Sequence, residues 1–243
     1  MDLGLKGKVA VVTGTGSQIG FGRAITLALA REGCNVAGFD IDENGAKQTA
    51  ADAAKLGVKA LGLKVDITSP DNVAAAVKQV LAEMGKIDIL VNNAGMDPGW
   101  EPFLDMDLNN MRKAMEVNLY GSMNTVKAIA PGMVAQKSGK IVNFSGGQGA
   151  PQSTSYSCSK GAVDSWSDVL AKELNPKGVM VNTFLPPPAA TKLGGHDETP
   201  EFFDRIAKMV PMGRLARPDE VGTMIAFLVS DVNSYMVGQY QKQ

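Results

Sequence analysis

The chain has little of the residue types on which several common kinds of site depend. Only two cysteines, Cys34 and Cys158, and one histidine, His196, occur among its 243 residues. These are too few for a zinc site built from cysteine and histidine, and two cysteines do not form a disulfide framework. A catalytic triad would depend on His196 alone. We therefore expect no metal site.

The sequence also lacks an excess of either charge and any long apolar run. Lys and Arg number 24 and Asp and Glu 25, which gives a net charge of -1. Nucleic-acid-binding proteins carry a basic excess, so we expect no nucleic-acid partner. No apolar run approaches the roughly 20 residues that cross a bilayer, and residues 1–8 lack the apolar segment of a signal peptide. We predict a soluble, cytoplasmic protein with no membrane partner.

What the chain does contain is an alternation of short apolar runs with longer amphipathic segments. The apolar runs predict strands at 9–12, 35–39, 58–65, 87–91, 141–144 and 179–184. The amphipathic segments predict helices at 21–31, 44–56, 70–84, 103–115, 118–136, 155–174 and 217–228. Strands that alternate with helices and are apolar throughout are typical of a parallel sheet covered on both faces. We predict one domain over 1–243, with an irregular segment at 192–212 as a candidate lid.

A glycine-rich turn follows the first predicted strand, where residues 13–22 read TGTGSQIGFG. Glycines at this place let the backbone approach a pyrophosphate, and the following helix offers free N–H groups at its N-terminus. Asp40 ends the second predicted strand, at the spacing from the turn at which a carboxylate binds the adenosine ribose hydroxyls. Because its charge would repel a 2′-phosphate, Asp40 favours NAD over NADP. The alternative is a solvated carboxylate at a strand end.

A phenol and an ammonium group lie four residues apart at Tyr156 and Lys160, and so on one face of a predicted helix. A cation beside a tyrosine lowers the pKa of its hydroxyl, which can then exchange a proton with an alcohol or a ketone. Asn118, Ser145 and the segment 92–95 lie at strand ends or at the helix starts that follow, where parallel sheets bind ligands. Each alone could be a turn or capping residue; together they predict one site.

These motifs resemble those of the classical short-chain dehydrogenase/reductase (SDR) family. The similarity also includes Asp66, Thr191 and the segments 211–214 and 218–221, and it runs from about Leu5 to Gln239. It implies a Rossmann-type, doubly wound parallel sheet of about seven strands with helices on both faces. The family is mostly tetrameric, so the resemblance implies a homo-oligomer, a tetramer or a dimer, in which helices 103–136 and 155–174 pack across a two-fold axis.

The resemblance also implies a role for each matching residue. Tyr156 would be the acid/base, Lys160 would lower its pKa and hold the nicotinamide ribose, and Ser145 would hydrogen-bond the substrate oxygen. Asn118 would help to hold a water that relays the proton to Lys160. The NAD cofactor would be bound by Gly14, Ser17, Ile19, Gly20, Asp40, Asp66, Ile67, Asn93, Ala94, Gly95, Tyr156, Lys160, Ala189 and Thr191.

The sequence departs from the family pattern in the glycine turn and near the catalytic tyrosine. Gln18 stands where the second glycine is expected, and two further residues precede Arg23. Alternatively, Gly20 and Gly22 are the conserved glycine pair after a two-residue insertion. The wider turn is similar to that of enoyl-thioester reductases. Gly146 takes the position of the usual serine, which leaves Ser145 as the best candidate and Ser153 as a weaker one.

A further departure follows the sixth strand, where Pro187 replaces a glycine. Proline fixes φ, so the chain takes another path past the nicotinamide if that glycine needs a positive φ. We also expect a short seventh strand.

The sequence predicts an NAD-dependent oxidoreductase that moves a hydride between nicotinamide and a secondary alcohol or the matching ketone. A 3-oxoacyl-thioester reductase is an alternative, although Asp40 argues against the NADPH preference usual for it. A nucleotide-binding protein without turnover is another, motivated by Pro187 and the short C-terminal end. A largely apolar substrate pocket is suggested by Met96, Trp100, Phe202, Phe203 and Met209.

Overall fold

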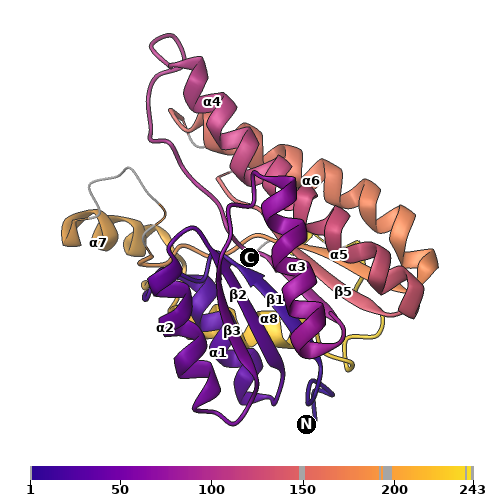
Figure 1. The fold of residues 1–243 in the computed structure, drawn as a ribbon. Coiled ribbons are helices and arrows are strands. Elements are labelled where there is room, and N and C mark those ends of the chain that lie inside the picture. The colour runs from indigo at the N-terminus through magenta and orange to yellow at the C-terminus, as the bar shows by residue number, and fades with distance from the viewer. Residues whose placement is uncertain (1, 148–150, 192, 194–198, 239, 242–243) are drawn as a thin grey trace.

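One parallel sheet forms the centre of the protein, in a computed structural model that describes residues 2–147, 151–191, 193, 199–238 and 240–241. The strand order is β3-β2-β1-β4-β5-β6-β7 (Figure 1). The strands are β1 Val9–Thr13, β2 Asn35–Asp40, β3 Ala60–Lys64, β4 Ile89–Asn92, β5 Gly139–Phe144, β6 Val179–Phe184 and the two-residue β7 Tyr240–Gln241. The order reverses between β1 and β4, and ligands of doubly wound sheets bind beyond the strand ends at this point.

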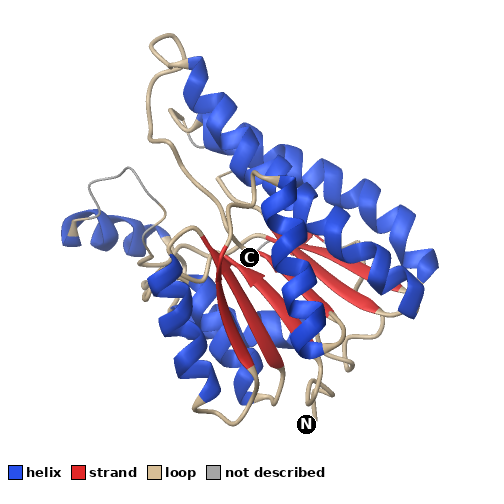
Figure 2. Cartoon of the chain, in the orientation of Figure 1, coloured by secondary structure: helices blue, strands red, loops and turns tan. Residues whose placement is uncertain are grey.

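Helices cover both faces of the sheet (Figure 2). They are α1 Phe21–Arg31, α2 Glu43–Ala54, α3 Pro70–Met84, α4 Leu108–Met115, α5 Ser122–Gln136, α6 Thr154–Leu174, α7 Pro200–Met209 and α8 Pro218–Leu228, with a π-helical turn η1 Glu116–Gly121 and a 3-10 turn η2 Asn175–Lys177. Among the described residues, no helix is both long and apolar enough to span a bilayer.

Alternate residues of the strands bury their side chains against different helices. Val9 and Val11 of β1 pack in one core with α3, α5 and α6. Ala10 and Val12 pack in the other core with α1 and α8. Because both faces are buried, every residue of β1 is buried, as the continuous apolar run in the sequence predicts. The predicted Rossmann-type sheet is confirmed, and its count of about seven strands includes the short β7.

Buried amide groups join the ends of β4 and β5. Asn92 Nδ2 donates to Asn143 Oδ1 at 2.9 Å, and Asn143 Nδ2 donates to Ser167 Oγ at 2.9 Å. Thr125 Oγ1 of α5 donates to Asn92 Oδ1 at 2.6 Å. Since buried polar groups need partners, this chain fixes α5 and α6 relative to the two strands that carry the site.

The prediction of an irregular segment at 192–212 is wrong for part of its length, because α7 occupies Pro200–Met209. Thr199 caps this helix by accepting a hydrogen bond from the backbone of Phe202, and Pro200 suits its first position. No residue of α7 is buried, and the helix lies apart from the sheet in Figure 1. Residues 192 and 194–198 of the candidate lid, which include His196, lie outside the described residues.

The predicted helix at 103–115 begins only at Leu108, because the Asp107 side chain caps it by accepting from Asn109 N. The predicted helix at 118–136 begins within the wide turn η1, and regular α-helix starts at Ser122.

Candidate active site

The glycine turn leaves β1 through a residue that must be glycine. Gly14 has φ +76°, and a Cβ there would lie 2.8 Å from the Asn93 amide nitrogen. Among the described residues, no acceptor takes the backbone N–H groups of Ser17, Gln18 or Ile19. These donors precede the N-terminus of α1, so the turn fits an anionic pyrophosphate.

Asp40 lies at the end of β2, against this turn. Its Oδ2 accepts from Gly16 N at 2.7 Å, and its Oδ1 accepts from Asp42 N at 2.8 Å. A Cβ on Gly16 would come within 2.8 Å of the carboxyl carbon. Each carboxylate oxygen has a further lone pair that can accept from a hydroxyl.

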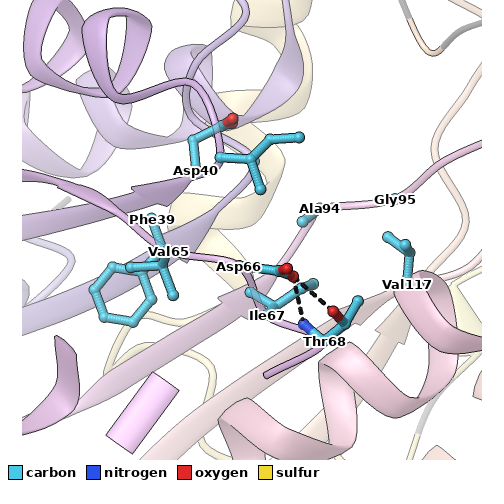
Figure 3. Close-up of a pocket in the computed structure, with 11 residues that line it drawn as sticks. Phe39, Asp40, Val65, Asp66, Ile67, Thr68, Ala94, Gly95 and Val117 are labelled. Carbon is cyan, nitrogen blue, oxygen red and sulfur yellow. Dashed lines mark hydrogen bonds between the residues drawn. The ribbon is translucent and has the colours of Figure 1, made fainter. Parts of the chain in front are cut away.

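A cavity of about 410 Å³ lies beyond the ends of β2, β3 and β4 (Figure 3). Asp66 lies on its wall and accepts from the backbone and hydroxyl of Thr68, at 2.9 and 2.7 Å. The lining holds two carboxylates and no Lys or Arg. Six predicted cofactor residues meet there, which are Gly14, Asp40, Asp66, Ile67, Ala94 and Gly95.

The other predicted cofactor residues do not line this cavity. Asn93 instead joins β4 to β1, because its Nδ2 donates to Thr13 O at 2.9 Å and to Gly14 O at 3.2 Å. The side chain of Ile19 is half exposed. Ser17 and Gly20 shape the turn, with Gly20 N donating to Ser17 O.

The residues after β6 lie in a separate segment. Ala189 pairs with Ala216 in an isolated bridge, and Thr191 N donates to Ala189 O. The contacts of Ala189 and Thr191 with a carboxamide stay predictions.

Tyr156 and Lys160 are buried side by side on α6. Lys160 Nζ lies 5.9 Å from the centroid of the Tyr156 ring and donates to Phe144 O at 2.8 Å. Burial lowers the pKa of Lys160 to about 8. The pKa of Tyr156 is raised, first by burial and then by the negative charge of Asp97. Burial thus acts against the lowering by Lys160 that the sequence predicts, and that lowering stays a prediction.

Asn118 connects the segment after β4 to α6. Its Oδ1 accepts from Met96 N at 2.8 Å, and its Nδ2 donates to Met96 O at 2.9 Å and to Ser159 Oγ at 2.8 Å. A Cβ on Gly95 would lie 3.1 Å from Asn118 Oδ1 and 3.3 Å from Lys160 Nζ. Asn118, Gly95 and Lys160 therefore converge, as the sequence predicts.

Comparison with known proteins identifies the family. A family model described as enoyl-(acyl carrier protein) reductase matches residues 14–241. Oxidoreductase UcpA of Escherichia coli K12 is 36% identical over 96% of this chain and 92% of its own. The chain belongs to the short-chain dehydrogenase/reductase family.

Other SDR relatives are named for different activities. The 3-oxoacyl-[acyl-carrier-protein] reductase FabG of Thermotoga maritima is 34% identical over 97% of this chain and 95% of its own. D-threitol dehydrogenase of Mycolicibacterium smegmatis is 36% identical over 98% and 91%. A crystal structure of NAD+-bound xylitol dehydrogenase superposes with a TM-score of 0.88 at 30% identity, covering 97% of each chain. The chain is thus an SDR oxidoreductase among both dehydrogenases and reductases.

Asp97 is a residue of the site that the sequence reasoning missed. Its carboxylate is buried and accepts from Gly99 N and from Trp100 Nε1, both at 3.1 Å. The sequence contains a sign that Asp97 belongs to the site, because it is a charged residue directly after the segment 92–96 at the end of a strand. The buried Asn143 was missed in the same way, as an amide within an apolar strand.

The two serine candidates of this SDR do not hydrogen-bond Tyr156. Ser145 Oγ is buried and has no hydrogen-bond partner among the described residues. Ser153 Oγ accepts from Ser157 Oγ at 3.3 Å. Gly146 and Gly147 both lie against Tyr156, because a Cβ on Gly146 would overlap the tyrosine hydroxyl and a Cβ on Gly147 would overlap the ring. The absence of side chains at these two glycines therefore makes room for Tyr156.

We expect Gly146→Ala to lower the free energy of unfolding by about 1–3 kcal/mol, because the added methyl overpacks the site. Tyr156→Phe should recover part of that loss, since it removes the overlapping oxygen. Denaturant unfolding of both single variants and the double variant measures the coupling. Gly161→Ala is the control, because a Cβ there has no atom within 4 Å. Equal stability of Gly146→Ala and the wild type would contradict the packing.

Proposed function

We propose that this SDR is an NAD-dependent dehydrogenase of secondary alcohols, or a reductase of the matching ketones. The observation that carries the NAD preference is the Asp40 carboxylate, which is bonded to the phosphate turn at Gly16. A 2′-phosphate placed beside it would meet a negative charge, and no Lys or Arg lines the cavity to offset the repulsion. Arg23, the cation closest to the turn in sequence, pairs with Asp52 at 2.8 Å.

The site's residues fit a nicotinamide dinucleotide along its whole length. The turn would hold the pyrophosphate, Asp40 the adenosine ribose, Asp66 the adenine edge and Lys160 the nicotinamide ribose. When bound, the nicotinamide supplies the hydride acceptor or donor. The protein's own contribution is to orient the reactants and to move a proton.

Tyr156 is the group that we propose moves this proton. Its hydroxyl gives a proton to a ketone oxygen, or its phenolate takes one from an alcohol. A buried phenolate is costly unless a cation is near, and the Lys160 ammonium supplies that charge from the same helix face. Asn118 fixes the neighbouring Met96 and Ser159, and Ser145 remains the candidate donor to the substrate oxygen.

Two of the relatives support a hydroxylated substrate. D-threitol dehydrogenase and xylitol dehydrogenase are named for polyols, which carry secondary hydroxyl groups. The FabG relative keeps a 3-oxoacyl-thioester reductase as the second candidate. A cavity without cations argues against the NADPH preference usual for that activity.

We also propose that the protein forms a homo-oligomer, a dimer or a tetramer, through the surface of η1, α4 and α6. Tyr120 and Val169 expose about half of their side chains there, and Leu108 is exposed at the start of α4. A partner copy would remove these apolar groups from water.

The cofactor preference is tested by titrating the protein with NADH and NADPH and following nicotinamide fluorescence. We expect NADH to bind at least tenfold more tightly than NADPH. Asp40→Asn should weaken NADH binding by about tenfold, and the Kd values for NADH and NADPH should then lie closer together. Asp168→Asn is the control, since this exposed carboxylate pairs only with Lys172 among the described side chains. Tighter binding of NADPH would favour the thioester reductase.

The role of Tyr156 is tested by Tyr156→Phe, which removes the acid/base but keeps the ring. We expect turnover of a secondary alcohol with NAD+ to fall by at least a hundredfold, while the Kd for NADH stays within about twofold. A wild type that binds NADH but turns over neither polyols nor 3-oxoacyl thioesters would instead favour a binding protein without turnover.

The Asp97 carboxylate allows a test of how a nearby charge sets the pKa of Tyr156. Its charge raises the pKa of Tyr156, so Asp97→Asn should lower that pKa. Alcohol oxidation needs the phenolate, and the rising limb of its pH–rate profile should therefore move to lower pH. Asp105→Asn, at an exposed carboxylate of the same segment, is the control. An unmoved profile would show that the charge of Asp97 does not reach the reacting proton.

A further inference from the structure

Gln18 lies in the wide phosphate turn, between Gly14 and the start of α1. The glycine that packs the helix on this turn is Gly22, because a Cβ there would overlap Gly14 O, so Gln18 is one of the residues that widen the turn. A side chain that pointed into the turn would block the approach of a pyrophosphate. Gln18 is not among the described non-glycine residues with positive φ, which are Lys137 and Gln152. The glutamine is therefore accommodated without strain, and what matters is the direction of its side chain.

That side chain turns towards α2. Its Nε2 donates to Gly16 O at 2.8 Å and to Gly45 O at 3.1 Å, and Thr49 Oγ1 lies 3.5 Å away. Gly16 belongs to the turn, whereas Gly45 and Thr49 belong to α2. One amide group thus bridges two segments of the chain.

A second contact joins the same two segments. Thr49 Oγ1 donates to Thr15 O at 2.8 Å in a buried hydrogen bond. Gly45 has no room for a side chain, because a Cβ there would overlap Gly16 O. The first turns of α2 are therefore packed directly on the carbonyl side of the phosphate turn.

The backbone of Gly16 is hydrogen-bonded on both sides of its Cα atom. Its N–H donates to Asp40 Oδ2 at 2.7 Å, and its carbonyl accepts from Gln18 Nε2. The carboxylate proposed to bind the adenosine ribose and the turn proposed to bind the pyrophosphate share this one residue. A change in the Gln18 contact would therefore move both groups.

We propose that Gln18 is a positioning residue for the dinucleotide, whose side chain latches the phosphate turn to α2 and keeps Gly16 aligned with Asp40. The latch, which we define as Gln18 with the carbonyls of Gly16 and Gly45, holds the wide turn in one position against α2. This proposal rests on the proposed binding of a nicotinamide dinucleotide.

Two variants of Gln18 test the latch. Gln18→Gly removes the side-chain contacts without adding charge, and Gln18→Glu keeps the size of the side chain but removes both donor hydrogens. We expect each to raise the Kd for NADH by about three- to tenfold, the change that the loss of a typical hydrogen bond produces. Gln48→Glu on α2 is the matched control, because its exposed amide donates only to Asp52, at 3.2 Å, among the described residues.

Hydrogen exchange of the protein without nucleotide separates positioning from direct contact. In Gln18→Gly, we expect the hydrogen-bonded amides of Gly16 and Gly20 to exchange about three- to tenfold faster, while exchange in the rest of the sheet stays unchanged. Faster exchange together with weaker NADH binding supports the latch. Weaker binding with unchanged exchange would overturn it, since Gln18 would then contact the ligand itself.

The same pair of measurements distinguishes the two proposals. Unchanged exchange and an unchanged Kd for NADH would overturn the latch and leave the dinucleotide function intact. If the wild type binds neither NADH nor NADPH, the proposed function fails, and Gln18 then has no dinucleotide to position, whatever the exchange rates show.

Discussion

The hydrogen bonds that join the end of β4 to the end of β1 hold the parts of this site together. Asn93 closes the topological switch point by donating to the carbonyls of Thr13 and Gly14, and Thr13 Oγ1 accepts from the backbone of Asn93 and Ala94. Parallel strands leave their carboxyl ends without further sheet partners, so these buried groups need partners elsewhere. The partners they find set the separation between the phosphate turn and the segment that leads to the catalytic side.

Burial decides the electrostatics on that catalytic side. Tyrosine and lysine side chains in water have pKa values close to their ordinary ones. Here both side chains are almost fully buried, which raises the pKa of Tyr156 and lowers the pKa of Lys160, so that the neutral form of each is favoured. Asp97, also buried, adds a negative charge to the same environment. Gly146 and Gly147, which have no side chains, leave the space in which the tyrosine hydroxyl and ring lie.

Much of this arrangement could be predicted from the chain alone, and the exceptions have particular causes. The strands, Asp40, Asp66 and the Tyr156 pair were predicted because apolar runs and motif spacing are local signals. The helix α7 was missed, although Thr199 and Pro200 form an ordinary helix start. The contacts of Gln18 with α2 could not be predicted, because they join residues 27 positions apart. The burial of Tyr156 could not be predicted either, because a four-residue spacing to Lys160 does not report how deeply the pair is enclosed.

The sequence by itself determined the family, the alternation of strands and helices, and the residue types at each strand end, since these depend on periodicity and on motifs read along the chain. Only the tertiary structure decided which polar groups meet. It assigned Asn93 to a cross-strand contact rather than to the cavity wall, placed Gly146 rather than a serine against Tyr156, and turned Gln18 towards α2. The physical reason is that hydrogen-bond partners and burial depend on packing between distant segments, which local sequence does not encode.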